Sequence, residues 1–422
     1  MSSMNRCDIV VVGAGAAGLA ATRTLTDRGL PAICLEARDR VGGRAWTDAE
    51  TFGVPVDRGC AWLHSADINP WRAIAAGLGF TVRERQPQWQ VRVGKRWRDK
   101  DGAEWDAAVE TGLAVIEAAG AAGRDVPASS VIDGDGPYSP LLGAIITWIS
   151  GVEATAWSTL DSARYVDTGK DWPIVEGYGA LVARFGAGLP VRLRTPATAI
   201  RWDGPGVTVE TPVGTIAAKA AIVTVPPSVL AAGAIRFHPA LPVAKQEAIA
   251  NIPLGVNDKV MFAVAGDPFG MPVDSHATAS AETVRTISFQ FRPFGRDVVI
   301  GYLGGTLARD LEQAGSAAMA DFAAGELVAM FGADIRGKLG KASCTNWFMD
   351  PWSRGGYSAT RPGHAHRRAD LAAPLADRLF FAGEACSVEA CATCHGAYLT
   401  GVAAAEAAAK VVTQREGGAP SS

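Results

Sequence analysis

The sequence has almost no excess of charge of either sign. Its 422 residues include 40 Lys and Arg and 43 Asp and Glu, so the formal net charge is −3. Proteins that bind nucleic acid usually carry a basic surface, and this balance therefore excludes nucleic acid as the expected partner. The same balance does not distinguish an acidic from a cationic small substrate.

Long hydrophobic runs are also missing. No stretch of 18 or more uncharged apolar residues occurs, so neither a membrane-spanning helix nor a membrane partner is expected. The apolar stretch after Arg6 opens on Asp8 and is interrupted by glycines, which argues against a signal peptide. Hydrophobic residues make up 48% and charged residues 20%, as in ordinary globular proteins. The length predicts roughly two or three domain-sized units.

Cysteine occurs in an odd number, seven residues, without a recognisable export signal. This predicts reduced thiols and a cytoplasmic location. The last three cysteines nevertheless raise the question of a metal. The stretch CATCH, residues 391–395, has the C-x-x-C-H form that attaches a c-type haem, and together with Cys386 it has the C-x4-C-x2-C spacing of a plant-type ferredoxin. A haem or iron–sulfur electron carrier is therefore one alternative function.

The N-terminal segment contains the pattern of a dinucleotide-binding unit. An apolar run at 8–12 predicts a buried parallel strand, and the sequence GAGAAG follows it directly. Gly13 allows a tight turn, Gly15 lets the backbone approach a pyrophosphate, and Gly18 lets the next helix pack on the strand. A second predicted strand ends at Glu36, where an acid binds the ribose hydroxyls of an adenine dinucleotide. This order of elements does not separate NAD from FAD.

The loop that follows favours FAD. Residues 38–44, RDRVGGR, resemble the segment that follows the dinucleotide motif in flavin amine oxidases and related FAD proteins. Paired glycines let such a loop pass close to a planar cofactor, and Arg38 and Arg44 can hold pyrophosphate through bidentate hydrogen bonds.

Four later segments resemble the same family, in the family's order. PVDRGCAWLHSADINPW at 55–71 resembles the segment that runs beneath the flavin in monoamine and polyamine oxidases. AAIVTVPPSVL at 220–230 looks like the strand and turn that return the chain to the cofactor domain. Residues 346–363 resemble the stretch with a tryptophan near the flavin, and residues 378–408 resemble the closing signature of the family.

This resemblance implies the roles of individual residues. Residues 252–262, IPLGVNDKVMF, resemble the strand that carries the family's lysine, so Lys259 is expected to be catalytic and to hold a water near flavin N5. The implied substrate-binding residues are His64, Tyr357, Thr393 and Trp352. The implied cofactor-binding residues are Gly13, Gly15, Ala16, Gly18, Glu36, Ala37, Arg38, Gly43, Arg44, Gly59, Cys60, Ala61, Trp62, Ala197, Trp347, Gly383, Glu384, Thr393, Cys394 and Ala397. No metal site is expected.

At two places the chain departs from the family pattern. Monoamine and polyamine oxidases commonly frame the amine between two aromatic rings; Tyr357 fits one ring, but Thr393 stands where the second is usual. Thr393 is predicted instead to cap the last helix, whose N-terminus would stabilise negative charge on the reduced flavin. Monoamine oxidases attach the flavin through a cysteine, whereas the matching stretch RGGYS at 354–358 has none, so FAD is expected to bind non-covalently.

The predicted fold class is α/β, with a discontinuous Rossmann-like FAD-binding domain of the glutathione-reductase type and an inserted α+β substrate domain. The expected FAD-binding domain comprises 1–66, 186–244 and 345–414, the expected substrate domain 67–185 and 245–344, and the expected disordered tail 415–422.

The expected function is oxidation of an amine by hydride transfer to flavin N5. The imine would hydrolyse to an aldehyde or ketone, and oxygen or another acceptor would reoxidise the flavin, with peroxide formed from oxygen. Two alternatives use the same fold: an L-amino-acid oxidase, which needs a cationic anchor such as Arg72 or Arg164, and an amine dehydrogenase that passes electrons to a quinone or cytochrome. The haem or iron–sulfur carrier is a remote alternative because no fourth iron–sulfur ligand is evident. Cys391 and Cys394 are a candidate redox-sensitive pair at a helix start, and a homodimer is left open.

Overall fold

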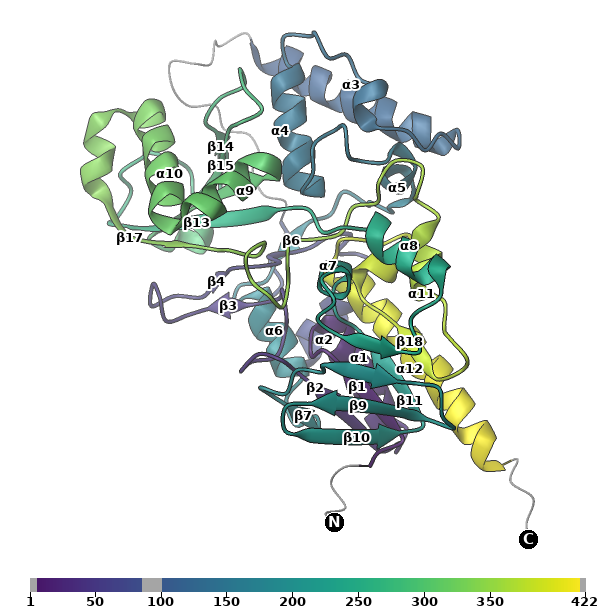
Figure 1. Ribbon diagram of the computed structural model, residues 1–422. Helices are drawn as coiled ribbons and strands as arrows, with labels where there is room; N and C mark the ends of the chain where they lie inside the picture. The colour runs from purple at the N-terminus through teal and green to yellow at the C-terminus, as the bar shows by residue number, and fades with distance from the viewer. Residues whose placement is uncertain (1–5, 86–100, 418–422) are drawn as a thin grey trace.

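The computed structural model describes residues 6–85 and 101–417. The chain folds into two lobes (Figure 1). One lobe is built on a parallel sheet and lies next to both ends of the chain, and the other combines an antiparallel sheet with a group of helices. The α/β fold class expected from the sequence is confirmed.

The parallel sheet has the strand order β18-β11-β1-β2-β7. The central strand β1 is buried along its whole length, as expected for a parallel strand covered on both faces. β2 and β7 lie on one side of β1, and the later strands β11 and β18 lie on its other side. The order in which strands are added to the sheet therefore reverses between β1 and β11. In such sheets ligands bind outside the carboxyl ends of the strands at this change. The strands are β1 (Ile9–Val12), β2 (Ala32–Leu35), β7 (Val191–Arg192), β11 (Ala220–Val223) and β18 (Leu379–Phe381).

Alternate side chains of β1 face two different cores. Ile9 and Val11 lie in the core that includes helices α1 (Ala16–Asp27) and α12 (Cys394–Gly417). Val10 and Val12 face a second sheet of order β10-β9-β8-β12. This sheet consists of β8 (Ala199–Arg201), β9 (Val207–Thr211), β10 (Gly214–Ala218) and β12 (Arg236–His238).

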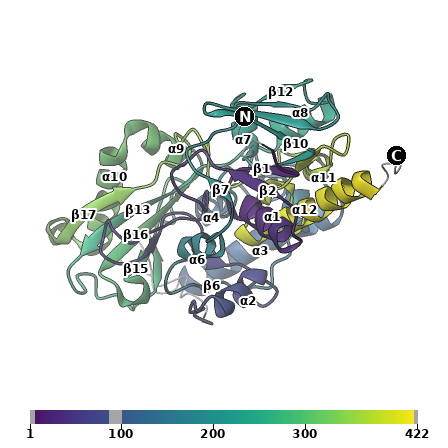
Figure 2. The ribbon, with the colours of Figure 1, turned by 90° about the horizontal axis from the view of Figure 1, so that it is seen from below.

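Helices α1 and α12 lie side by side (Figure 2). Gly401 permits this close approach, because a Cβ atom there would lie 2.2 Å from the carbonyl oxygen of Ala17. Helices α2 (Pro70–Gly77) and α6 (Tyr178–Phe185) join the same core through Trp71 and Tyr178. The expected domain boundaries put both helices into the substrate domain, whereas their packing assigns them to the cofactor side. With these two helices reassigned, the division into domains stays a proposal.

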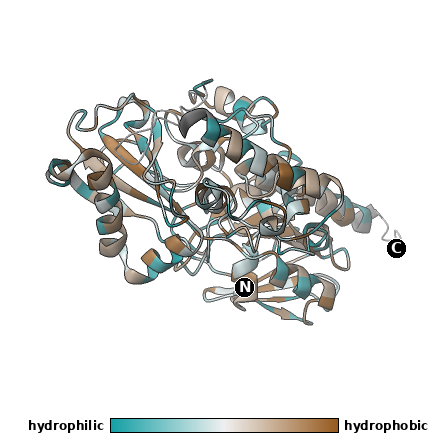
Figure 3. Ribbon diagram, turned by 90° about the horizontal axis from the view of Figure 1, so that it is seen from above, coloured by the Kyte–Doolittle hydropathy of each residue, from teal (hydrophilic) through white to brown (hydrophobic). Residues whose placement is uncertain are grey.

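The second lobe contains an antiparallel sheet of order β14-β15-β16-β13-β17. Helices α9 (Gly305–Ala314) and α10 (Ser316–Phe331) share a core with this sheet, whereas α3 (Asp101–Ala121) and α4 (Ser139–Ser150) form a separate one. The strands are β13 (Asn257–Val264), β14 (His276–Thr278), β15 (Ser288–Phe291), β16 (Val298–Gly304) and β17 (Leu339–Cys344). The helices mix brown and teal segments when coloured by hydropathy (Figure 3), and within the described ranges none has the length and apolar character needed to span a membrane.

Two two-stranded sheets, four short α-helices and four short 3-10 helices complete the described elements, the 3-10 helices being Ala128–Ser130, Pro293–Gly295, Ala333–Lys338 and Glu384–Cys386. The two-stranded sheets are formed by β3 (Thr47–Asp48) with β4 (Val56–Asp57), and by β5 (Trp62–Leu63) with β6 (Trp172–Pro173). The β5–β6 pair matters for the site, because it joins the segment after β2 to residues that lie far along the chain. The short helices are α5 (Thr159–Arg164), α7 (Pro227–Ala231), α8 (Val243–Asn251) and α11 (Arg367–Ala372).

The expected disordered tail begins too early. Helix α12 continues to Gly417, so residues 415–417 are helical, and 418–422 lie outside the described residues. The helix packs against the first core as far as Val412, and a helix already formed extends at the gain of one hydrogen bond per residue.

Candidate functional site

The glycine-rich loop after β1 has the geometry that a pyrophosphate needs. Gly13 has φ of +103°, and a Cβ atom on Gly18 would lie 1.7 Å from the carbonyl oxygen of Gly13, so both positions require glycine. Gly15 is the N-cap of α1 and has no side chain to bind the first N–H groups of the helix. A Cβ atom on Gly15 would meet no atom within 4 Å, so the space in front of this helix end is open. Free N–H groups facing open space fit the phosphates of FAD.

Glu36 lies directly after β2, beside this loop. Its carboxylate accepts hydrogen bonds from the backbone N–H groups of Ala14 and Arg38, each at 2.8 Å, and the residue is buried. Ala37 follows it, and Ala197 is buried in the core that contains the end of β2. The backbone N–H of Thr195, two positions before Ala197, donates to the carbonyl of Glu36 at 2.7 Å, so these segments, distant in sequence, lie side by side. Their contact with FAD stays a prediction.

The two arginines expected at the pyrophosphate make different contacts. The Arg38 guanidinium pairs with Asp350 at 2.5 Å and donates to the Ser353 hydroxyl at 2.6 Å. Trp352 lies in this same turn with 39% of its surface exposed. Trp352 is not among the residues that line the cavity beside Lys259, and its contact with the substrate stays a prediction.

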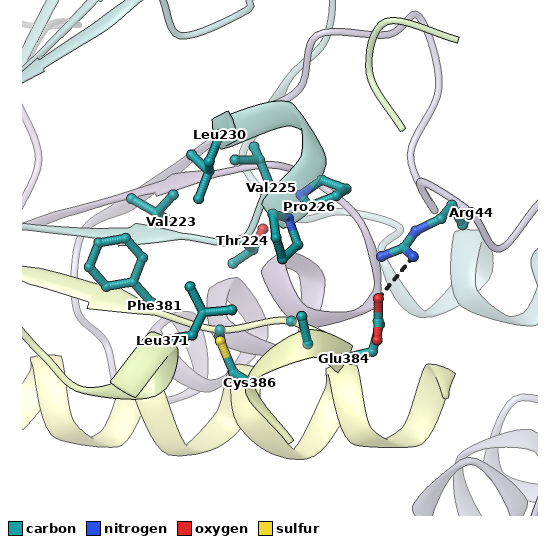
Figure 4. A pocket seen from close by; sticks show the side chains of 14 residues that line it. Arg44, Val223, Thr224, Val225, Pro226, Leu230, Leu371, Phe381, Glu384 and Cys386 are labelled. Carbon is teal, nitrogen blue, oxygen red and sulfur yellow. Dashed lines mark hydrogen bonds and ion pairs between the residues drawn. The ribbon is translucent and has the colours of Figure 1, made fainter. Parts of the chain in front are cut away.

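Arg44 lies at a cleft at the carboxyl ends of β11 and β18 (Figure 4). Its guanidinium pairs with Glu384 at 2.9 Å and donates to the carbonyl oxygen of Gly356 at 2.5 Å. The Thr224 hydroxyl, in the wall of the same cleft, donates to the carbonyl of Val12 at 2.9 Å, which ties the end of β11 to the end of β1. This cleft thus brings together three of the expected cofactor-binding residues, Arg44, Gly383 and Glu384.

Lys259 lies on β13 and is buried beneath the 59–62 segment. Its Nζ atom donates to the carbonyl oxygens of Asp57 and Gly59, both at 2.7 Å. Burial lowers the pKa of Lys259 to about 8, against the opposing effect of nearby Asp57. Gly59 must be glycine, because a Cβ atom there would lie 1.6 Å from the carbonyl oxygen of Arg44. The structure therefore joins Lys259 to the segment that the sequence predicts to run beneath the flavin.

The amine of Lys259 also faces two aromatic rings. It lies 5.9 Å from the ring centre of Trp62 and 5.4 Å from that of Tyr302, and the two rings are 5.5 Å apart. All three residues line a cavity, and the Tyr302 hydroxyl donates to Gln290 at 2.8 Å. Sequence analysis missed Tyr302, which is the cross-strand partner of Lys259 in the β13–β16 register. Only that register, which a single sequence does not reveal, could have identified it.

Trp347 is held rigidly next to the same segment. It is buried, its indole N–H donates to the carbonyl of Arg58 at 3.2 Å, and its ring meets Trp46 edge to face at 6.4 Å. Asp258 accepts from the Trp347 backbone N–H at 3.3 Å. Burial and the neighbouring Glu312 raise the pKa of Asp258 well above its usual range.

Thr393 caps helix α12, as predicted. Its hydroxyl accepts from the backbone N–H of Gly396 at 3.0 Å and donates to the carbonyl of Ala390 at 2.7 Å. The turn is so tight that a Cβ atom on Gly396 would lie 1.9 Å from that carbonyl oxygen. Tyr357 is the residue expected to supply one of the aromatic rings that frame the amine. Its hydroxyl donates to the carbonyl of Trp148, which fixes the orientation of its ring.

His64 follows β5 and is close to the start of α12. Its Nδ1 atom lies 2.6 Å from the Asp171 carboxylate, and the exposed fraction of its side chain is 43%. Burial, and secondarily the charge of His64, lowers the pKa of His395 to about 4. Asp171 is a second residue that the sequence analysis missed, since it is 107 positions away from His64 and belongs to no recognised motif.

The cysteines of CATCH have different surroundings. All seven cysteines of the chain are free, and burial raises the pKa of Cys391 to about 12. The thiol of Cys394 interacts with that of Cys60, and this contact and burial raise the pKa of Cys60. The expectation of a reactive, low-pKa Cys391 is therefore wrong, because desolvation outweighs the helix end. Across residues 6–85 and 101–417, no three or more His, Cys, Asp or Glu side chains are grouped so as to hold a metal ion.

A buried ion pair connects this region to the helical lobe. The Arg368 guanidinium binds both carboxylate oxygens of Asp161, at 2.6 and 2.7 Å, and both side chains are almost fully buried. Arg368 also donates to the Ser358 hydroxyl at 2.8 Å, which in turn donates to Glu384 at 2.6 Å. Through Glu384 the chain of contacts reaches Arg44 in the cleft of Figure 4.

Comparison with known proteins places the chain in a well-populated group. Residues 16–127 and 123–409 match a family described as flavin containing amine oxidoreductase. The chain is 30% identical to polyamine oxidase 2 of Arabidopsis thaliana, covering 97% of this chain and 89% of the relative. It is 29% identical to polyamine oxidase 4 of Oryza sativa subsp. japonica, covering 97% and 90%.

Solved structures agree in fold. A putrescine oxidase variant superposes with a TM-score of 0.78 at 20% identity, and a cyclohexylamine oxidase from Brevibacterium oxydans with a TM-score of 0.75 at 22% identity. Each comparison covers 97% of this chain and 99% of the other.

Proposed function

Because the chain belongs to the family of flavin-containing amine oxidoreductases and is an FAD-dependent amine oxidase, we propose that it oxidises a primary or secondary aliphatic amine beside Lys259. The observation that carries this proposal is the position of the Lys259 amine, 2.7 Å from two carbonyl oxygens of the 57–59 segment and beside the neighbouring rings of Trp62 and Tyr302. Non-covalently bound FAD, which the glycine loop, Glu36 and Arg44 would hold, would supply the acceptor for a hydride from the carbon next to the amine nitrogen.

The side chains of the chain have distinct tasks in this proposal. Lys259 holds a water at the reacting face, and the lowered pKa gives it a neutral fraction at mildly alkaline pH. The rings of Trp62 and Tyr302 exclude bulk water from that face. The N-terminus of α12, capped by Thr393, directs free N–H groups and the positive end of its dipole at the charge that develops on the cofactor.

Amines are favoured over amino acids as substrates by the contacts of the two candidate carboxylate anchors. Arg72 pairs with Glu84 at 2.5 Å and stacks on Trp172 at 4.9 Å. Arg164 donates to the carbonyl oxygen of Ala365 at 3.3 Å. Both guanidinium groups are therefore engaged in contacts within the chain.

Anaerobic mixing with a panel of amines tests the proposal. Putrescine, spermidine, cyclohexylamine and benzylamine would be compared with L-amino acids, and bleaching of the flavin band near roughly 450 nm would identify the reducing compound. We expect an aliphatic amine to bleach the flavin and Lys259→Met to slow that bleaching. Bleaching by an L-amino acid and by none of the amines would overturn the proposal. Reoxidation with and without oxygen, with peroxide measured, then tests oxygen as the acceptor.

Location and assembly stay proposals of the same kind. The seven free thiols support a reducing compartment such as the cytoplasm. A homodimer is testable by sedimentation, which would give twice the chain mass of 43.9 kDa.

A further inference from the structure

Asp57 connects Lys259 to the start of helix α6. Its backbone carbonyl accepts a hydrogen bond from the Lys259 amine at 2.7 Å. Its carboxylate accepts from the backbone N–H groups of Tyr178 at 2.9 Å and Gly179 at 3.1 Å, the first two residues of α6. Asp57 and Lys259 also line the same cavity. One residue therefore binds the expected catalytic amine through its backbone and a helix end through its side chain.

Thr47 completes the surroundings of this carboxylate. It is the direct partner of Asp57 in the β3–β4 pair. Its hydroxyl accepts from the backbone N–H of Ala180 at 2.8 Å and donates to the Asp57 carboxylate at 2.5 Å. Burial raises the pKa of Asp57, and the charge of Lys259 and the hydrogen bonds from three donors oppose this rise. Because all three partners donate, the surroundings suit the ionised carboxylate, which accepts hydrogen bonds and donates none.

The helix start and the β3–β4 pair are in tight contact. Gly177, the N-cap of α6, has φ of +101°, and a Cβ atom there would lie 2.4 Å from the Thr47 side chain. A Cβ atom on Gly179 would lie 2.3 Å from the backbone nitrogen of Thr47. The two glycines thus allow the approach that fixes the position of the carboxylate before a substrate binds.

The distance from this carboxylate to the Lys259 amine has an upper limit. By standard bond lengths, a carboxylate oxygen of aspartate lies at most about 5 Å from the carbonyl oxygen of the same residue. The Asp57 carbonyl oxygen lies 2.7 Å from Nζ, so the carboxylate lies within roughly 8 Å of the amine. At an effective dielectric constant of about 20, a unit charge at this distance changes a pKa by roughly one to two units.

Asp57 supplies negative charge next to this amine. Burial lowers the pKa of Lys259 to about 8, Asp57 opposes this change and Arg58 adds to it. Arg296, which lines the same cavity, is also positive. The Asp258 carboxyl belongs to the next residue of β13, so it faces the other side of the strand. Three further titratable neighbours have pKa values that burial or a thiol contact moves away from neutral pH, namely His276, Tyr302 and Cys60.

We propose that Asp57 is a positioning residue for amine oxidation, with its carbonyl fixing the Lys259 amine and its carboxylate stabilising the protonated form of that amine. The inference rests on the proposed function, in which Lys259 holds a water at the reacting face. Thr47 and the start of α6 keep the carboxylate in place. Neutralising Asp57 should therefore move the ionisation of Lys259 to lower pH.

The pH dependence of flavin reduction tests this role. The limiting rate of anaerobic reduction by a saturating amine would be measured in the wild type, Asp57→Asn and Lys259→Met. The part of the pH profile that disappears in Lys259→Met belongs to Lys259, whereas ionisation of the bound amine remains in that variant. In Asp57→Asn this part should shift to lower pH by roughly one unit. A residue that only stabilised the fold would leave its position unchanged.

A second measurement needs no turnover. Because the folded pKa of Lys259 is depressed, the wild type gains stability over Lys259→Met as pH rises from the folded towards the unfolded pKa. The pH at which their difference in urea midpoint begins to grow therefore reports the folded pKa. With Asp57→Asn in both proteins, this onset should move down by roughly one pH unit. Asp57→Ser, whose hydroxyl can still accept from the start of α6, is a second neutral variant and should give the same shift.

Glu176→Gln is the matched control. Glu176 lies one position before the N-cap Gly177 and accepts from the backbone N–H of Thr81 at 2.8 Å. Its replacement removes one negative charge near the same helix start and leaves the contacts of Lys259 intact. We expect the pH profile and the onset to stay as in the wild type. An equal shift in Glu176→Gln would overturn the inference, because the overall charge of this region would then be responsible.

The outcomes separate this inference from the proposed function. An unshifted profile and an unshifted onset in both neutral variants of Asp57 would overturn the inference, while flavin bleaching by an amine would still support amine oxidation. A pH profile of Lys259→Met equal to that of the wild type would also overturn it, because the ionisation of Lys259 would not influence the rate. Absence of bleaching with every amine would instead overturn the proposed function, whatever the urea series shows.

Discussion

Replacing Arg368 by methionine should be among the most destabilising single changes in this protein. The guanidinium is fully buried and binds Asp161 through two atoms, at 2.6 and 2.7 Å. Methionine fills much of the volume but leaves the Asp161 carboxylate in the interior without its counter-charge. Removing one partner of a buried pair typically costs about 3–5 kcal/mol. The free energy of unfolding should fall by this amount.

A double variant tests whether the loss of stability in Arg368→Met comes from the unpaired Asp161 carboxylate. In the double variant Asp161→Leu with Arg368→Met, both charges are gone and an apolar contact takes their place. Such replacements are often close to neutral. Asp161 also accepts from the backbone N–H of Thr360 at 3.1 Å, so some loss remains. The double variant should nevertheless be more stable than Arg368→Met alone.

Urea unfolding followed by tryptophan fluorescence measures these changes. FAD must be held at one fixed excess, because a ligand that binds only the folded state adds to its apparent stability. Arg285→Met is the control: Arg285 pairs with Asp310 at 2.9 Å, but about half of each side chain is exposed, so less than about 1 kcal/mol is expected. A loss in Arg368→Met no larger than in Arg285→Met would refute the reasoning.

Three further changes test other parts of the structure. Burial lowers the pKa of Lys259 to about 8, so between that pH and the usual pKa near 10.4 the unfolded chain binds more protons than the folded chain. As pH rises through this window, the wild type should therefore gain up to roughly 3 kcal/mol of stability relative to Lys259→Met. An equal difference in urea midpoint between the two proteins at pH 7 and pH 10 would contradict this prediction. Gly401→Ala should force α1 and α12 apart, cost about 1–3 kcal/mol and weaken FAD binding measured by fluorescence titration, whereas Gly325→Ala, where a Cβ meets only Arg336 at 3.9 Å, should not. Thr393→Val should remove the cap of α12, lower the stability of the protein by about 1 kcal/mol and lower the flavin reduction potential. Thr393→Ser should preserve the stability and the reduction potential. Equal reduction potentials in the two variants would count against an effect of the helix end on the cofactor.

Much of the cofactor region could be predicted because its signals are local. Gly13 has a positive φ, a Cβ atom on Gly18 would meet the carbonyl oxygen of Gly13, and Thr393 caps a helix that begins at the next position. Such features depend on backbone conformation and on contacts between nearby residues, so the local sequence pattern is enough to predict them. Lys259 was found in another way, through its resemblance to a family strand.

The predictions that failed depended on packing across the molecule. The sequence does not say that burial outweighs the helix end at Cys391. The expected tail starts too early for the same reason, since α12 packs along the first core and continues to Gly417.

The sequence by itself determined the class of protein: a glycine turn, an acid at the end of a second strand, an arginine loop and a lysine strand, in an order typical of FAD amine oxidases. Only the tertiary structure decided which side chains work together. Lys259 faces Tyr302 through a strand register, and His64 meets Asp171, 107 positions away, through the pairing of β5 with β6. The physical reason is that turns and caps are specified by neighbours in the chain, whereas register and long-range contacts are set by the burial of all apolar side chains at once.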